Sequence, residues 1–144
     1  MNTFTAEELG YLRTQPLGRF ATVDEQGRPQ VRPVGFFLDP ETGAVVIGGV
    51  AGSNMAGSRK YRNAAARPQV ALVVDDVDTR QGWEPRGVEI RGTAETRDEG
   101  GAAVGVRLGA SFPFDDAWLL LHPLRVLSWG LTGSAFDLNA RDVA

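Results

Sequence analysis

The sequence contains one wholly cationic segment inside an acidic chain. From Thr42 to Val74 there is no aspartate or glutamate, although the overall content of 18 acidic residues in 144 predicts about four in such a segment. The same segment carries Arg59, Lys60, Arg62 and Arg67. Two interpretations are open at this point, a binding site for an anion and a solvated basic face.

The position of two of these cations favours a phosphate. The residues predict a short helix from Arg59 to Ala66, with Ser58 as its N-cap. Arg59 and Lys60 then occupy the first turn, where the helix macrodipole disfavours a cation by about 0.3–1 kcal/mol. Free N–H groups, a hydroxyl and two cations at one helix start are the groups that a phosphate selects.

The glycine-rich loop before this helix, Val50 to Gly57, matches neither common nucleotide motif. Gly57 is not followed by the Lys-Ser or Lys-Thr pair of a P-loop. Gly48, Gly49 and Gly52 do not have the spacing of a dinucleotide fingerprint, and no βαβ pattern surrounds them. Both motifs are therefore rejected.

Other residues that could do chemistry have plainer explanations. His122 has no cysteine or second histidine to pair with, so a structural role is favoured over a catalytic triad. Asp75, Asp76 and Asp78 could bind a cation, but acidic turn residues commonly follow a buried strand. We therefore predict no metal site, and we name no catalytic residue because no pair looks like a positioned acid and base.

Composition excludes several classes of protein. The absence of cysteine excludes disulfides, thiolate nucleophiles, zinc fingers and iron–sulfur clusters. A net charge of −3 argues against a general nucleic-acid partner, and no apolar stretch approaches the ~20 residues of a membrane span. The first residues lack the features of a signal peptide, so we expect a cytoplasmic protein with a single domain over residues 1–144.

The elements that must position these residues are mostly strands. A helix is predicted from Ala6 to Gln15, with a capping box made by Thr5 and Glu8. Period-two patterning between turn signals predicts six strands, at residues 20–23, 29–38, 44–48, 70–74, 88–96 and 125–129. We further expect a polar loop at 75–87, a helix capped by Asp98 and an irregular tail. The predicted fold is mainly β, a closed or partly closed antiparallel barrel with two or three short helices.

Five segments of the chain also match a known family, in order and at family-like spacing. They are GRPQVRPV at 27–34, GSRKYRN at 57–63, PQVALVVDD at 68–76, WEPRGVEIRG at 83–92 and RVLSWG at 125–130. In these segments the chain resembles the pyridoxamine-5′-phosphate oxidase-like split β-barrel proteins, and in particular their actinobacterial branch, which uses the deazaflavin coenzyme F420.

The resemblance implies an FMN-binding split barrel and a homodimer with two cofactor sites at the subunit interface. The cofactor phosphate would lie on Ser58, Arg59 and Lys60. The resemblance implies that the ring system lies along the second strand and the end of the third, at Arg32, Pro33, Val34, Gly35, Phe36, Ile47, Gly48 and Gly49. For Trp129, near the end of the chain, two roles are open, packing in the core and contact with the cofactor site of the partner subunit, and we include it among the cofactor-binding residues.

Two departures from the oxidases bear on which cofactor is bound. The loop before the cationic helix is longer than theirs. Their ring-binding Arg-Met-Val-Leu-Leu-Lys stretch corresponds to Val31–Phe36, where the lysine is lost. These departures argue against oxidation of pyridoxamine phosphate and favour coenzyme F420 over FMN.

The function expected from this resemblance is a reductase that depends on reduced F420 and transfers hydride to a small organic substrate. In such chemistry the cofactor carries the reaction, while the protein binds, orients and excludes water. Two alternatives remain. One is an FMN-dependent oxidoreductase similar to pyridoxamine-phosphate oxidase, and the other is a flavin- or F420-binding protein without catalytic activity.

Overall fold

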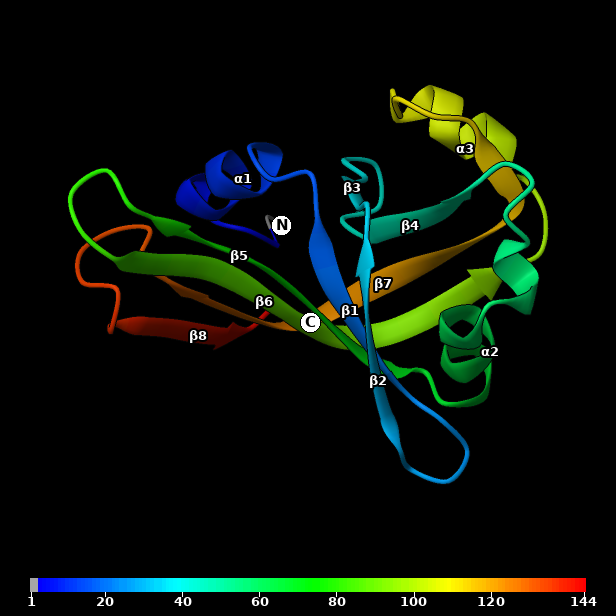
Figure 1. Cartoon of the computed structure of the whole chain (residues 1–144), viewed down its shortest axis with the longest axis horizontal. Coiled ribbons are helices and arrows are strands. Elements are labelled where there is room, and N and C mark those ends of the chain that lie inside the picture. Colours follow the sequence, from blue (N-terminus) through cyan, green and yellow to red (C-terminus); the bar gives the residue numbers. More distant parts are fainter. Residues whose placement is uncertain (1–2) are drawn as a thin grey trace.

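The computed structural model describes residues 3–144 as a strongly curved sheet with short helices around it (Figure 1). The sheet has eight strands in the order β2-β1-β5-β6-β7-β4-β3, with β8 paired to β7, and every pairing is antiparallel. The strands are β1 (Gly18–Val23), β2 (Pro29–Val34), β3 (Phe37–Leu38), β4 (Val45–Val50), β5 (Gln69–Asp78), β6 (Glu84–Arg97), β7 (Phe114–Trp129) and β8 (Leu138–Asp142). This confirms the predicted antiparallel class.

The barrel is split where the chain passes from β2 to β3. These two strands are the opposite edges of the sheet, yet two residues, Gly35 and Phe36, connect them. The sheet must therefore curl until its edges lie close together. We call Gly35–Phe36 the seam. The single strand predicted over residues 29–38 is wrong in this detail, because the chain leaves one edge of the sheet at Val34 and joins the other at Phe37.

The inside of the curled sheet forms the main core. Fully buried side chains from five different strands meet there, among them Phe20, Ile47, Leu72, Ile90 and Leu121. A second, smaller cluster lies between the outer face of β4 and β7 and helix α3 (Gly101–Arg107), which covers Val46, Phe114 and Leu120. Among the described residues, no helix is long and apolar enough to cross a membrane.

Helix α1 (Ala6–Arg13) begins as predicted and ends two residues early. The capping box is confirmed: Thr5 Oγ1 accepts from the Glu8 N–H, and Glu8 Oε1 accepts from the Thr5 N–H. The helix stops at a C-cap on Thr14, before Pro16, which cannot continue a hydrogen-bonded turn.

The expected polar loop at 75–87 is mostly strand. β5 continues to Asp78 and β6 begins at Glu84, so the connecting loop is short. Asp76 lies directly opposite Arg86 in the register, and the two side chains form an ion pair. Favourable cross-strand charge pairs of this kind stabilise a sheet through polar residues that resemble a loop in sequence.

Three further expectations near the C-terminus are corrected. β7 starts at Phe114 rather than Arg125, and it passes Pro123 through a bulge opposite Arg91 and Gly92. Helix α3 takes Gly100 as its N-cap, with a φ of 92°, and not Asp98. The tail is not irregular, because β8 pairs with the end of β7.

Candidate functional site

Helix α2 (Arg59–Ala66) carries the predicted phosphate-binding residues, and its start has the expected cap. Ser58 is the N-cap, and its hydroxyl accepts from the Tyr61 N–H at 3.4 Å while donating to the Met55 carbonyl at 2.7 Å. The backbone N–H groups of Arg59 and Lys60 have no acceptor among the described residues, which is the usual state of a first helical turn. They are available to a ligand.

Two buried side chains fix α2 against the sheet. Asn63 Nδ2 donates to Thr22 Oγ1 of β1 at 3.1 Å, and the Tyr61 hydroxyl donates to Asp98 Oδ1 beyond the end of β6. Burial, with help from Asp98, raises the pKa of Tyr61 to about 12, so the phenol stays protonated and bonded. These contacts hold the helix rigidly while its first turn remains accessible.

The loop before α2 is held by a residue that the sequence analysis missed. The Asp115 carboxylate accepts from the Gly52 N–H at 3.3 Å and from the Met55 N–H at 2.9 Å. These bonds lower the pKa of Asp115 below its usual range. Asp115 lies 60 residues from Met55 in a strand that was not predicted, so no local pattern could have identified it.

Most of the cations of the protein are neutralised by carboxylates, but those around α2 are not. Of the 15 lysines and arginines, nine form ion pairs among the described residues: Arg19, Arg28, Arg80, Arg86, Arg91, Arg97, Arg107, Arg125 and Arg141. The six without a carboxylate partner in residues 3–144 are Arg13, Arg32, Arg59, Lys60, Arg62 and Arg67. All except Arg13 lie on or beside α2, and we call these five the α2 cation cluster.

The charge of Arg32 of β2 acts on Lys60 of α2. Burial, and then the charge of Arg32, lowers the pKa of Lys60 below its ordinary value. Two cations held together beside a helix N-terminus are destabilised until an anion joins them. The residues present therefore fit a phosphate group of a cofactor.

The other predicted ring-binding positions differ in what they can offer. Val34, Phe36 and Ile47 are buried in the main core, so these positions offer a ligand little or no surface. Pro33 is exposed, and a Cβ at Gly35 would meet only ring atoms of Phe112 at 3.9 Å. The surface beside the seam is therefore open at Pro33 and Gly35.

The glycines that end β4 allow close packing between strands and loop. A Cβ on Gly48 would lie 2.4 Å from the ring of Phe114, and one on Gly49 would lie 3.0 Å from the Cβ of Met55. Both positions thus lie at the junction of β4, β7 and the loop before α2. Packing alone accounts for these glycines, whether or not they also contact a cofactor.

Trp129 lies far from α2 in the same chain. It pairs with Gly87 near the start of β6, whereas Tyr61 of α2 contacts Asp98 just beyond the end of that strand. About ten residues of extended chain, or roughly 30 Å along the strand, separate the two points. Figure 1 shows β8 and α2 at opposite ends of β6. One chain cannot bring Trp129 to its own α2 cation cluster.

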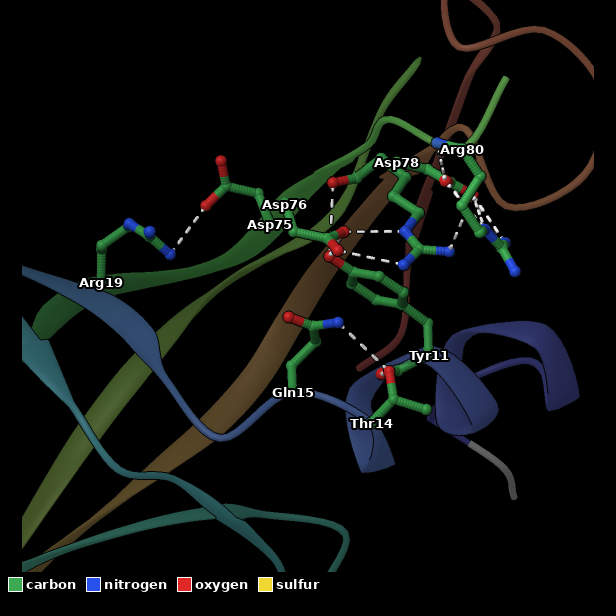
Figure 2. Close-up of polar contacts among 9 residues, drawn as sticks. Tyr11, Thr14, Gln15, Arg19, Asp75, Asp76, Asp78 and Arg80 are labelled. Atoms are coloured by element: carbon green, nitrogen blue, oxygen red, sulfur yellow. Dashed lines mark hydrogen bonds and ion pairs between the residues drawn. The ribbon is translucent and has the colours of Figure 1, made fainter. Parts of the chain in front are cut away.

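The three aspartates considered for a cation are engaged by other side chains (Figure 2). Asp76 accepts from Arg86 and from the Tyr11 hydroxyl, and Asp78 accepts from Arg80. Arg19 Nη1 approaches Asp75 Oδ1 to 2.9 Å, although not with hydrogen-bond geometry. These contacts fasten α1 and the ends of β5 and β6 together, and they account for the acidic run without a metal.

His122 pairs with Glu95 across β6 and β7. The His122 Nε2 and Glu95 Oε1 atoms are 2.8 Å apart, and both side chains are partly exposed. The hydrogen bond to His122 helps to lower the pKa of Glu95. This is a cross-strand polar pair of the ordinary kind, and it supports the structural interpretation of the single histidine.

Comparison with known proteins gives one family match and several relatives. The model of the pyridoxamine 5′-phosphate oxidase family matches residues 4–129. A 5a,11a-dehydrotetracycline/5a,11a-dehydrooxytetracycline reductase of Streptomyces rimosus is 39% identical over 141 residues, which cover 97% of this chain and 93% of the relative.

Two solved structures are similar in both fold and sequence. An F420 reductase is 26% identical with a TM-score of 0.59, and the match covers 81% of this chain and 93% of that one. A pyridoxamine 5′-phosphate oxidase assigned in Lactobacillus delbrueckii is 28% identical with a TM-score of 0.60, and the match covers 88% and 94%. With the split antiparallel barrel, these matches show that the chain belongs to the pyridoxamine 5′-phosphate oxidase family.

Proposed function

We propose that this protein is a reductase that depends on reduced coenzyme F420 and transfers hydride to a small organic substrate, with the cofactor bound between two copies of the chain. The family and the reductases among its relatives support the coarser part of this proposal, an oxidoreductase. The choice of F420 over FMN rests on the F420 reductase among the similar structures and on the lysine missing from Val31–Phe36.

The observation that carries the proposal is the α2 cation cluster. Five cations have no carboxylate partner among the described residues, and all lie on or beside one short helix whose first N–H groups are free. A solvated basic face gives no reason for two of them, Arg59 and Lys60, to lie in the first helical turn, where the macrodipole disfavours cations. A bound phosphate explains this arrangement, because it neutralises both charges.

The substrate class follows from the relative in S. rimosus, which is named for the reduction of a dehydrotetracycline. We propose a similar conjugated ketone for this chain. Bound at this site, reduced F420 would supply the hydride and the two electrons that reduce a C=C bond conjugated to a carbonyl, with the proton taken from water.

The residues of the chain serve binding and orientation in this reaction. Lys60, Arg59 and the helix N-terminus hold the phosphate, and Arg32 joins them from β2. Exposed Pro33 and partly exposed Gly35, on either side of buried Val34, come next along the chain and would support the ring system. Both tyrosines that could donate a proton, Tyr11 and Tyr61, are committed to aspartates and have a raised pKa, so neither is assigned that role.

A second copy of the chain would complete the site. Trp129 is separated from its own α2 by most of β6, so we assign it to the cofactor site of the partner. Phe136 is 88% exposed and Leu138 is 61% exposed near the same end of the molecule. Large exposed apolar side chains of this kind are typical of an interface.

The direct test replaces both cations of the first helical turn, Arg59→Gln with Lys60→Gln. Charge-assisted hydrogen bonds contribute roughly 1.5–3 kcal/mol each, so F420 affinity should fall by about two to four orders of magnitude. The melting temperature without cofactor should hold or rise slightly, because two cations leave the positive end of a helix. Titration of F420 and of FMN, with melting curves taken without cofactor, measures both effects.

The matched control removes two arginines that already have carboxylate partners, Arg28→Gln with Arg91→Gln. It makes the same change in net charge and should leave F420 affinity within about twofold. If the two double variants bind F420 equally well, the phosphate site is wrong. If FMN binds the wild type better than F420 does, the cofactor assignment is wrong.

A further inference from the structure

A pocket of about 550 Å³ lies beside the seam, between α1 and the turn that joins β3 to β4. Its walls are mostly apolar and aromatic, with Phe4, Leu9, Leu12, Phe36 and Phe37 among them. We call it the seam pocket. Its volume is in the range that small-molecule sites occupy, and apolar walls with a few polar groups are typical of such sites.

One polar group of the seam pocket is unavailable to a ligand. Asp39 is 3% exposed, and its carboxylate accepts from both terminal nitrogens of Arg107 at 3.1 and 3.0 Å and from the Glu41 N–H. The hydrogen bonds from Arg107 lower the pKa of Asp39 below its ordinary value, so the carboxylate is ionised at neutral pH and is paired with Arg107. Asp39 is part of the wall and has no capacity left to attract a cation.

Two other polar groups of the pocket are available. Arg13 is the one cation outside the α2 cation cluster that has no carboxylate partner among residues 3–144. The Gln15 amide donates to its neighbour Thr14 at 3.2 Å and to no other residue of the described chain. The free charge at the pocket is therefore positive, with an amide two residues away.

The seam pocket shares Phe36 with the stretch predicted to bind the cofactor ring. Phe36 and Phe37 follow directly on Arg32–Gly35, the stretch that would run along the cofactor from its phosphate to its ring. Phe36 lies four residues after Arg32, which corresponds to at most about 13 Å. A ligand in the pocket would thus lie at the end of the strand that is remote from the phosphate.

We propose that the seam pocket binds the substrate, and that this substrate is a flat, mainly apolar polycycle with an ionised enol or phenol oxygen, which pairs with Arg13. This inference rests on the proposed function, since it places the hydride acceptor beside the cofactor ring. The aromatic walls favour a flat carbon skeleton. Arg13 and the Gln15 amide supply the hydrogen-bond donors that an anionic oxygen requires.

The test compares two probes that differ in charge and hardly in shape. 2-Hydroxy-1,4-naphthoquinone carries an ionised enolic oxygen at neutral pH, and 2-methoxy-1,4-naphthoquinone is its neutral counterpart. Binding of each to the cofactor-free protein is measured by calorimetry. The wild type should bind the hydroxy probe about tenfold more tightly, because one charge-assisted hydrogen bond distinguishes the two probes.

Two substitutions assign that preference to the pocket. Arg13→Gln should abolish the preference for the hydroxy probe, so that both probes bind with the affinity of the methoxy compound. Gln15→Glu should weaken binding of the hydroxy probe alone. Arg28→Gln is the matched control, because Arg28 is exposed in the turn between β1 and β2 and pairs with Asp24. This control should retain the tenfold preference. Melting curves establish that each variant is folded.

The outcomes separate this inference from the proposed function. If the wild type does not prefer the hydroxy probe, or if Arg13→Gln keeps the preference, the seam pocket is not the site of an anionic substrate, even where F420 binding depends on Arg59 and Lys60. If F420 does not bind but the preference depends on Arg13, the pocket assignment stands and the proposed cofactor is wrong.

Discussion

At the scale of single residues, Lys60 is the most unusual side chain of the candidate site. It is half-buried, it has no carboxylate partner in the described chain, and it lies beside Arg32. Burial and the neighbouring guanidinium both oppose its positive charge. A folded protein tolerates such a group where a ligand compensates it, so the state of Lys60 should depend on whether an anion is bound.

This dependence predicts an unusual pH profile for cofactor binding. The pKa of Lys60 is lowered from its ordinary 10.5, so its ammonium is lost at a lower pH than that of an exposed lysine. F420 affinity should therefore fall as the pH rises toward 10.5. In the Lys60→Arg variant the charge persists, and affinity should stay level over the same range. Fluorescence titrations between neutral pH and pH 10.5 measure both; parallel curves for the two proteins would contradict the role of Lys60.

At the scale of elements, a buried ion pair joins the two ends of the chain. Glu8 of α1 is 1% exposed, and its carboxylate accepts from Arg141 of β8 at 2.6 and 2.9 Å. Arg141 also donates to the Thr3 carbonyl. Burial raises the pKa of Glu8, but the hydrogen bonds from Arg141 and Thr5 together hold it below its ordinary value. The last strand is thus fastened to the first helix by one arginine.

Removal of that arginine should be costly. Arg141→Met leaves a buried carboxylate without its partner, which should lower the free energy of unfolding by about 3–5 kcal/mol at pH 7. The loss should shrink in the double variant Arg141→Met with Glu8→Gln, because no charge is then left unpaired. Urea denaturation measures all three proteins.

The matched control is Arg125→Met. Arg125 of β7 pairs with Asp142, which follows Arg141 in β8. This pair is exposed and should contribute less than about 1 kcal/mol to the free energy of unfolding. Equal losses for Arg141→Met and Arg125→Met would contradict the role of the buried pair. The pair is present above the ordinary pKa of glutamate, 4.5, and its contribution is lost as the pH falls through the lowered pKa of Glu8.

At the scale of the whole molecule, the two ends of the barrel differ. One end carries α2 and the other carries β8 (Figure 1). Trp129 pairs with the first residue of β8, and exposed Phe136 comes two residues before that strand. A single chain keeps these features apart. Two copies that pair these ends would place Trp129 of one over the cofactor of the other, and would cover apolar surface at the same time.

A dimer of this kind makes the oligomeric state and cofactor affinity change together. Light scattering at micromolar concentration should give twice the 15.5 kDa of one chain. Phe136→Asp with Leu138→Asp should shift the particle to 15.5 kDa and weaken F420 binding, because Trp129 of the partner is removed with the interface. A wild type of 15.5 kDa, or a monomeric variant with unchanged affinity, would contradict the shared site.

The sequence by itself determined the features that depend on near neighbours. The Thr5–Glu8 capping box, the Ser58 cap of α2 and the alternation from Val88 to Ala94 all follow from residues within a few positions of one another. The missing acids between Thr42 and Val74 likewise predicted which helix would carry unneutralised cations. Local hydrogen bonds and periodicity are sufficient for these features.

Only the tertiary structure decided the rest, because it depends on partners far along the chain. The ion pair between Asp76 and Arg86 stabilises strand pairing in a polar stretch that resembles a loop in sequence. Asp115 holds the loop before α2 from a position 60 residues away from Met55. The seam exists because the two edges of the sheet meet, and no short sequence pattern encodes that closure. Arg107 and Arg141 likewise find their carboxylates on elements far along the chain, whereas Arg13, without such a partner among residues 3–144, lies beside a pocket.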